Sequence, residues 1–236
     1  MIKELKKVFF NKLFPNWSPD IALRYLPIVT EINKYPPEFT ILDVGSGSLG
    51  ITPYLKRKVT GADKEFLGPE TQLLKRVKTS AIKLPFNNSS YDIVLCVDVL
   101  EHVSPNKRSL VVGELIRIAK NKVFLSFPSG EYATKEDQFL FAYLNKKLHK
   151  TDQYLAEHLK FGLPDINIIN SYIPKTLNRV TINYVNIYLH RIILIMQFSD
   201  KRLGKIISSF IFILMLPIFS FINFEPTYRK LIIVDK

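Results

Sequence analysis

Three glycines within six residues follow a short apolar segment of the chain. The stretch ILDVGSGSLGITPYL covers residues 41–55 and contains Gly45, Gly47 and Gly50. Unpaired backbone N–H groups at the start of a helix, together with the positive end of the helix dipole, bind anions and the polar end of a nucleotide. Glycine permits backbone angles and close approaches that a Cβ atom would forbid. The stretch therefore predicts a nucleotide-binding turn between a strand and a helix, although G-x-G-x-x-G alone is a weak signal.

An acidic residue at the end of the next predicted strand strengthens this interpretation. Asp63, in KVTGADKEF, follows Gly45 at the spacing that puts a carboxylate at the carboxyl edge of the neighbouring strand. There it can accept hydrogen bonds from both ribose hydroxyls. The alternative is an ordinary strand-end aspartate that faces water. NAD-dependent dehydrogenases and S-adenosylmethionine (SAM) methyltransferases share this geometry, so both remain open at this point.

The elements that must position these residues follow an alternating pattern. Apolar segments alternate with more polar, helix-length ones, which indicates an α/β fold with a parallel sheet and helices on both faces. The predicted strands are TILDV, KVTGAD, SAIKLPF, YDIVLCVDV and KVFLSFP, then INIINSY at 166–172 and, ready to pair at an edge, the final YRKLIIVDK. Helical spacing predicts helices over 1–14, over 20–34, where Asp20 can cap, and over 137–161.

Composition narrows the class of protein. The 236 residues suit one α/β domain, and the single cysteine, Cys96, excludes an intramolecular disulfide and a cysteine-rich zinc site. It lies in an apolar run and is predicted to be a buried thiol, which suits a reducing cytoplasm. The net charge of +12 favours an anionic partner. No arginine-rich or aromatic-interleaved basic stretch is found, so we expect no nucleic acid partner.

An uncharged segment of seventeen residues precedes the last predicted strand. IISSFIFILMLPIFSFI, residues 206–222, follows Lys201, Arg202 and Lys205. A single crossing of a bilayer would separate the last strand from its sheet, so two interpretations remain: a helical hairpin that covers the domain, or helices that lie in the membrane interface. The apolar stretch at 187–198 favours the second. We therefore expect a cytoplasmic protein with an anionic membrane surface, the inner face of the cell membrane, as a candidate partner.

A third segment separates the two nucleotide-binding families. Residues 80–103, SAIKLPFNNSSYDIVLCVDVLEHV, contain a Leu-Pro-Phe turn, a Tyr-Asp pair and a Leu-Glu-His end. These residues are Leu84, Pro85, Phe86, Tyr91, Asp92, Leu100, Glu101 and His102. With the glycine turn they resemble the class I SAM-dependent methyltransferases of the small-molecule, type 11-like group, typified by ubiquinone and menaquinone pathway enzymes. The resemblance covers about 40–128 and the final strand.

The resemblance implies a Rossmann-like, seven-stranded, mostly parallel sheet with an antiparallel last strand and an apolar helical insertion before it. It also implies SAM as the cofactor. The residues expected around SAM are Asp43, Gly45, Ser46 and Gly47 at its methionine part, Asp63 with Lys64 at the ribose, Ser80, Ala81 and Ile82 at the adenine, and Val97 and Asp98 at the floor. Two positions depart from the family pattern: the third glycine is displaced to Gly50, and Ser80 replaces a common aspartate.

Methyl transfer to a hydroxyl needs a base, and His102 is the predicted catalytic residue because imidazole accepts a proton near neutral pH. The alternative is that His102 caps or packs the following helix. Some quinone-pathway relatives are thought to bind a divalent ion through a triad spaced like Asp98, Glu101 and His102, but we assign no metal ligands from the sequence. The remaining histidines are predicted to be surface or packing residues: His149, His158 and His190.

These expectations combine into one methyltransferase domain over residues 1–236. Its parts are a helical cap at 1–37, a SAM-binding core at 38–175, an apolar helical insertion at 176–226 and the final strand at 227–236. The predicted function is methyl transfer from SAM to a small-molecule, glycan or lipid-linked acceptor, at an oxygen. The alternatives are an NAD-dependent oxidoreductase and a methyltransferase-like protein that binds SAM without catalysis.

Overall fold

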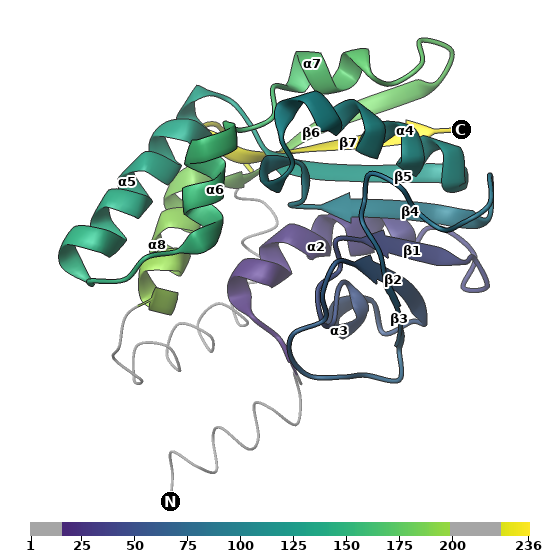
Figure 1. The fold of residues 1–236 in the computed structure, drawn as a ribbon, viewed down its shortest axis with the longest axis horizontal. Coiled ribbons are helices and arrows are strands. Elements are labelled where there is room, and N and C mark those ends of the chain that lie inside the picture. The colour runs from purple at the N-terminus through teal and green to yellow at the C-terminus, as the bar shows by residue number, and fades with distance from the viewer. Residues whose placement is uncertain (1–15, 199–222) are drawn as a thin grey trace, which may run out of the picture.

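The computed structural model describes residues 16–198 and 223–236. The helix predicted at 1–14 and the apolar segment at 206–222 with its basic flank lie outside the described residues. A seven-stranded sheet with the order β3-β2-β1-β4-β5-β7-β6 forms the centre (Figure 1). The strands are β1 (Ile41–Val44), β2 (Val59–Asp63), β3 (Leu74–Lys78), β4 (Tyr91–Val97), β5 (Ala119–Pro128), β6 (Asn178–Asn186) and β7 (Thr227–Asp235).

Strand directions agree with the predicted fold class. The pairs β1–β2, β2–β3, β1–β4 and β4–β5 are parallel, whereas β7 runs antiparallel to both of its neighbours, β5 and β6. The mostly parallel, seven-stranded sheet with an antiparallel last strand is therefore confirmed. The final strand, β7, pairs antiparallel with β5 as predicted, and β6 adds on its other side and takes the edge.

Alternation of side chains along the strands divides the core into two layers. In β4, Ile93 and Leu95 pack with the helices on one face of the sheet, while Val94 and Cys96 pack with those on the other. The first face is covered by α2 (Pro19–Ile32), α3 (Thr52–Leu55) and α8 (Ile187–Phe198), and the second by α4 (Arg108–Ile118) and α7 (Ile166–Ser171). Full burial of each such aliphatic side chain contributes about 1.5–3 kcal/mol. Cys96 is a buried thiol, as predicted.

Two helices and the end of a third stand beyond the carboxyl ends of the parallel strands (Figure 1). They are α5 (Glu131–Lys147), α6 (Gln153–Phe161) and α8, packed through Leu140, Leu144 and Leu155. The prediction of one or two helices over 137–161 is confirmed as two, although α5 begins six residues earlier, at Glu131. Helix α6 contacts η1, the short 3-10 helix Leu100–His102 that follows β4. A second 3-10 turn, η2 (Pro105–Lys107), leads into α4. The helical group is therefore placed over the end of β4.

Three local predictions are wrong. SAIKLPF forms a loop with an isolated bridge between Ser80 and Lys83, and the third strand is the preceding LKRVK at 74–78. Residues 166–172 form helix α7 instead of a strand, because the Asp165 side chain accepts from the N–H groups of Asn167 and Ile168 and caps a helix there. The segment predicted as a wholly helical insertion begins with strand β6, and only α8 follows it within the described residues.

The second helix begins one residue earlier than predicted and without the expected cap. Ser18 holds the cap position, and the Asp20 side chain makes no cap hydrogen bond; it pairs instead with Arg24 one turn later.

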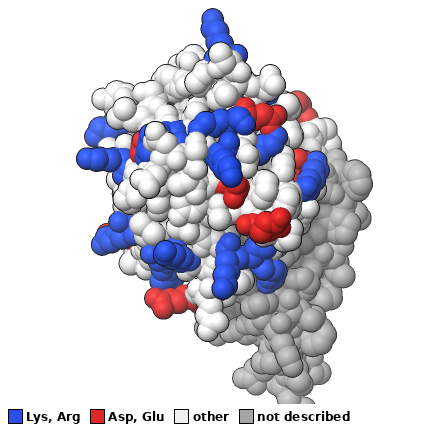
Figure 2. Space-filling model, turned by 90° about the vertical axis from the view of Figure 1, so that its right-hand side faces the viewer, with Lys and Arg blue, Asp and Glu red and all other residues white. Residues whose placement is uncertain are grey.

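Among the described residues, no helix has both the length and the apolar character that crossing a bilayer requires. Figure 2 shows Lys and Arg side chains singly or in small groups among uncharged ones. On that face, the positive charge is scattered.

Candidate functional site

The glycine turn leaves β1 through backbone conformations that favour glycine. The φ angles of Gly45, Gly47 and Gly50 are +78°, +55° and +54°. A Cβ atom on Gly45 would overlap Cγ2 of Val99, and one on Gly50 would overlap the carboxylate of Asp43. Gly45 and Gly50 are therefore needed for the path of the turn, whereas Gly47 is favoured by its φ alone, and the contact at Gly45 brings the turn against the segment that follows β4.

Asp43 supports the turn from inside the protein. Its side chain is fully buried; Oδ2 accepts from the N–H of Ile51 at 2.9 Å and from the hydroxyl of Tyr25 at 3.4 Å. Within the described part of the chain, Oδ1 has no hydrogen-bond partner. Burial raises the pKa of Asp43 to about 7, because water no longer stabilises its charge. Ser46 is also buried, with its hydroxyl donating to the carbonyl of Gly47 at 3.1 Å.

Asp63 meets the turn, as the spacing predicts. Its Oδ2 accepts from the N–H of Gly47 at 2.7 Å, and its Oδ1 accepts from the N–H of Glu65 at 3.2 Å. The side chain is half-buried, so lone pairs of both oxygens are left to accept further hydrogen bonds. The neighbouring Lys64 is exposed. The strand-end carboxylate and the bare turn therefore form one polar edge at the carboxyl ends of β1 and β2.

The loop after β3 borders the same edge. The N–H of Thr79 donates to the backbone carbonyl of Asp63 at 2.8 Å, which ties the start of the loop to the end of β2. Ser80, Ala81 and Ile82 follow and are partly buried, the last two against the second core layer. The three residues predicted for the adenine thus lie next in the chain to the residue that contacts Asp63.

The end of β4 carries a buried charge cluster. Val97 is buried, and Asp98, at φ +53°, accepts from Arg229 of β7, with Nη2 2.6 Å from Oδ2 and Nε 3.2 Å from Oδ1. Arg24 of α2 lies 3.3 Å from the same carboxylate. Burial alone would raise the pKa of Asp98, but the charges of Arg229 and Arg24 outweigh it and hold the pKa well below its usual range. Neither arginine was anticipated from the sequence.

His102 stands at the exit of η1, four-fifths buried. Its Nδ1 lies 2.8 Å from Oε2 of Glu157, on α6, and its ring packs edge-on against Tyr154 at 5.3 Å between centroids. Burial, and then the neighbouring His158, lower the pKa of His102 and outweigh the hydrogen bond to Glu157, which raises it. A neutral imidazole with Nδ1–H donating to Glu157 presents a lone pair on Nε2.

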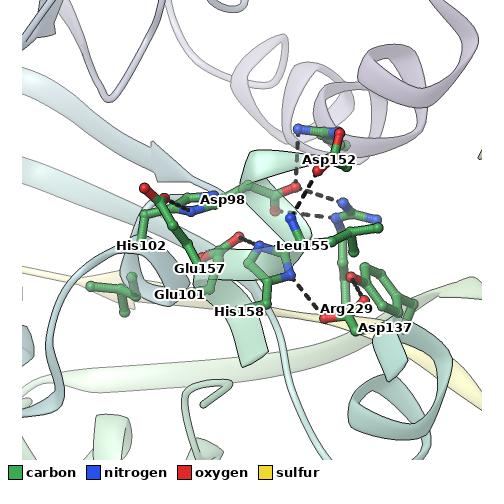
Figure 3. Close-up of polar contacts among 12 residues, drawn as sticks. Asp98, Glu101, His102, Asp137, Asp152, Leu155, Glu157, His158 and Arg229 are labelled. Atoms are coloured by element: carbon green, nitrogen blue, oxygen red, sulfur yellow. Dashed lines mark hydrogen bonds and ion pairs between the residues drawn. The ribbon is translucent and has the colours of Figure 1, made fainter. Parts of the chain in front are cut away.

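His158 joins this group from α6. Figure 3 shows its ring between Glu101 and Asp137. Nδ1 lies 2.8 Å from Oδ2 of Asp137, and Nε2 lies 4.0 Å from Oε1 of Glu101. The hydroxyl of Tyr228 donates to the other oxygen of Asp137. Burial, and then the charge of Asp98, raise the pKa of Glu101 to about 8.

Of the other histidines predicted to be surface or packing residues, His149 is exposed and His190 is buried, stacked on the ring of Tyr228 at 3.7 Å. His158 also packs in the interior, and in addition its two ring nitrogens interact with the carboxylates of Asp137 and Glu101. No local pattern marks this role of His158, since α6 approaches η1 only in the folded chain. The site thus combines a nucleotide-type edge with a titratable cluster on its η1 side.

Comparisons with known proteins agree with this geometry. Residues 42–127 match the family model described as a methyltransferase domain. A curated relative, an uncharacterized protein of Methanocaldococcus jannaschii, is 29% identical over 120 residues, which are 48% of this chain and 50% of that protein. The aligned part of the chain thus spans about half the length of that relative.

Two solved structures share the fold. One is a putative methyltransferase from an antibiotic biosynthesis pathway of Anabaena variabilis, with a TM-score of 0.51, 15% identity, and coverage of 90% of this chain and 98% of that one. The other is the plantazolicin methyltransferase BpumL, with a TM-score of 0.55, 11% identity, and coverage of 99% and 90%. At these identities the two structures show a shared fold only, and the support for a methyltransferase comes from the family model that matches residues 42–127. The chain therefore carries a methyltransferase domain match over residues 42–127, and its described part has the Rossmann-like fold of these methyltransferase structures.

Proposed function

We propose that the protein transfers the methyl group of SAM to an oxygen atom of a small-molecule, glycan or lipid-linked acceptor. The observation that carries the proposal is the polar edge formed by the glycine turn and Asp63. The matching domain also favours SAM over NAD, and the BpumL structure, a complex with S-adenosylhomocysteine, shows that a neighbour with this fold holds the demethylated cofactor.

The residues present fit such a ligand. Gly45, Gly47 and Gly50 have positive φ angles and no Cβ atom, so a ligand can approach the backbone of the turn closely. The Asp63 carboxylate has lone pairs for two ribose hydroxyls. Val97 and Asp98 end the strand beside the turn, where the methionine end is expected. Because Asp98 is held by two arginines, its role there is to fix the backbone and the local charge.

SAM supplies a methyl group on a positively charged sulfur, so transfer to oxygen is downhill and the chain has chiefly to align the acceptor and exclude water. We assign to His102 the acceptance of the acceptor's hydroxyl proton at Nε2. Its lowered pKa keeps the ring neutral near neutral pH, and Glu157 fixes the tautomer. As the oxygen–carbon bond forms, the carbon–sulfur bond breaks and S-adenosylhomocysteine leaves.

We propose that the protein binds its acceptor at the inner face of a membrane. Helix α8 is apolar along most of its length and exposes Tyr188 and Ile192, and the net charge of +12 favours an anionic surface. Flotation of the full chain with anionic liposomes, against a variant with residues 201–222 made polar, tests this. Equal flotation of both proteins would contradict attachment through that segment.

Titration calorimetry with SAM, S-adenosylhomocysteine and NAD tests the cofactor. We expect the first two to bind and NAD to give no heat; binding of NAD alone would refute the proposal. Labelled SAM with membrane lipid and glycan fractions then tests transfer. His102→Gln should leave SAM affinity unchanged and slow transfer roughly 100-fold to 10,000-fold. Binding of both SAM forms without transfer to any fraction would indicate a non-catalytic protein.

A further inference from the structure

Three side chains behind the proposed base gather like the ligands of a metal ion. One potential ligand atom from each of Glu101, His102 and His158 lies within 4.8 Å of the other two. Two imidazoles and one carboxylate are a donor set of Zn²⁺ and of other first-row divalent ions, and three protein ligands leave a position open. The residues come from η1 and from α6, which the fold brings together.

The buried ligand atoms in this group lack hydrogen-bond partners. Glu101 is fully buried, and neither of its carboxylate oxygens has a hydrogen-bond partner in the described chain; Nε2 of His158 has none either. A buried carboxylate without a hydrogen bond is costly, and the nearest opposite charge is Nε2 of His158, 4.0 Å away and beyond hydrogen-bond distance. A cation shared between Glu101 and the neighbouring nitrogens would compensate this cost.

Each histidine is also held in the way that metal-ligating histidines are held. Nδ1 of His102 faces Glu157, and Nδ1 of His158 faces Asp137 (Figure 3). Asp137 itself accepts from the hydroxyl of Tyr228. A carboxylate on one ring nitrogen fixes the tautomer and makes the other nitrogen a better ligand. Two such pairs in one cluster are more than packing requires.

We propose that Glu101, His102 and His158 bind one divalent transition-metal ion, with Zn²⁺ as the reference ion. Asp98 is excluded from the set because Arg229 and Arg24 already occupy its carboxylate. The site therefore differs from the Asp98, Glu101, His102 triad considered above, and it takes a histidine from α6 instead.

Binding requires the three side chains to close up. In a tetrahedral zinc site with bonds of about 2.0–2.1 Å, neighbouring ligand atoms are roughly 3.3 Å apart. Nε2 of His158 and Oε1 of Glu101 are 4.0 Å apart, so a side-chain adjustment of under about 1 Å brings this pair to that spacing. An ion held by Nε2 of His102 would itself lower the pKa of a bound acceptor hydroxyl, so the proton acceptance assigned to His102 above applies to the chain without the ion.

Metal binding is measured without SAM or acceptor, so its failure is distinct from a failure of the proposed function. The full chain, without an affinity tag, is freed of metal with a chelator and titrated with Zn²⁺ by calorimetry. We expect one ion per chain, and no heat from Mg²⁺ at the same concentration, because nitrogen ligands disfavour it. Substitution of Co²⁺ should give visible absorption bands typical of nitrogen and oxygen ligands.

Matched variants separate this site from surface histidines. Glu101→Gln and His158→Gln should abolish the Zn²⁺ heat, Asp137→Asn should weaken binding roughly 10-fold to 100-fold, and His149→Gln, at an exposed histidine outside the cluster, should bind as the parent does. Circular dichroism checks that each variant is folded. The proposal is overturned if the parent chain binds no Zn²⁺, or if folded Glu101→Gln and His158→Gln both bind like the parent.

Discussion

Replacing Gly45 by alanine tests the reasoning about the turn most directly. Two costs add at this position. The φ of +78° is unfavourable for a residue with a Cβ atom, at about 1–2 kcal/mol, and the added methyl group overlaps Cγ2 of Val99, at about 1–3 kcal/mol for an overpacked contact. We expect the free energy of unfolding to fall by roughly 2–5 kcal/mol, against a typical total of about 5–15 kcal/mol.

Two other glycines provide matched controls. Gly47 has a φ of +55° but no atom within 4 Å of an added Cβ, so Gly47→Ala should carry only the backbone cost of about 1–2 kcal/mol. Gly113 lies in α4 with equally open space, and Gly113→Ala should stabilise the protein by about 0.5–1 kcal/mol. Adding Val99→Ala to Gly45→Ala should recover the overlap cost and leave the backbone cost.

Urea unfolding followed by circular dichroism gives each free energy, with the slope m as a check that the transition is unchanged. The comparison that matters is Gly45→Ala against Gly47→Ala. If the two lose equal stability, or if Val99→Ala restores nothing, the close contact between the turn and the segment after β4 is not what fixes the glycine at position 45.

Three further predictions concern acidic side chains. Asp63→Asn should weaken SAM binding about 10-fold to 100-fold in calorimetry, because hydrogen bonds to a charged group contribute about 1.5–3 kcal/mol; unchanged affinity would contradict the ribose role. Asp98→Ala should lower the free energy of unfolding by about 3–5 kcal/mol, because it leaves Arg229 buried without its closest counter-charge, and a loss below about 1 kcal/mol would show that the pair is not structural. Burial raises the pKa of Asp43 from 3.8 to about 7, so the folded protein holds a proton that the unfolded chain releases between those values. The free energy of unfolding should therefore fall as pH rises from about 4 to about 7, and Asp43→Asn should flatten that slope; equal slopes in both proteins would refute it.

The parts of the site that could be predicted are those that local sequence encodes. Gly45 and Asp63 each lie directly after a short apolar strand, so the parallel sheet brings them to one edge without any need for distant contacts. Strand β3 was missed because LKRVK carries three cations and only Leu74 of its five residues is buried, so at this sheet edge apolar content is a poor guide. The helix at 166–171 was missed although Asp165 is an ordinary cap signal, because its isoleucines favoured a strand.

The parts that could not be predicted depend on tertiary approach. Strand β6 does show alternation through Val180, Ile182 and Tyr184, but the apolar stretches that follow it at 187–198 and 206–222 led to a helical interpretation of the whole insertion. No pattern in α6 marks His158, whose partners lie 21 and 57 positions away in the chain. The same holds for Arg24 and Arg229, which are ordinary surface candidates until two ends of the chain meet at β4.

The contact of α2 and β7 with the end of β4 affects the acceptor side of the site. Asp98 follows the strand nearest the proposed transfer site, and its two arginines come from α2 and from β7, which lie before and after the matched methyltransferase domain in the chain. A buried ion pair is weak evidence for stability, since desolvation offsets much of its Coulomb attraction, but breaking it leaves a charge with no partner. The cluster therefore selects one arrangement of α2, β4 and β7 over others of similar packing. Because His102 and Glu101 follow Asp98 within four residues, the same cluster fixes where the proposed base and ligands stand, and variants of Arg24 should shift acceptor KM more than SAM affinity.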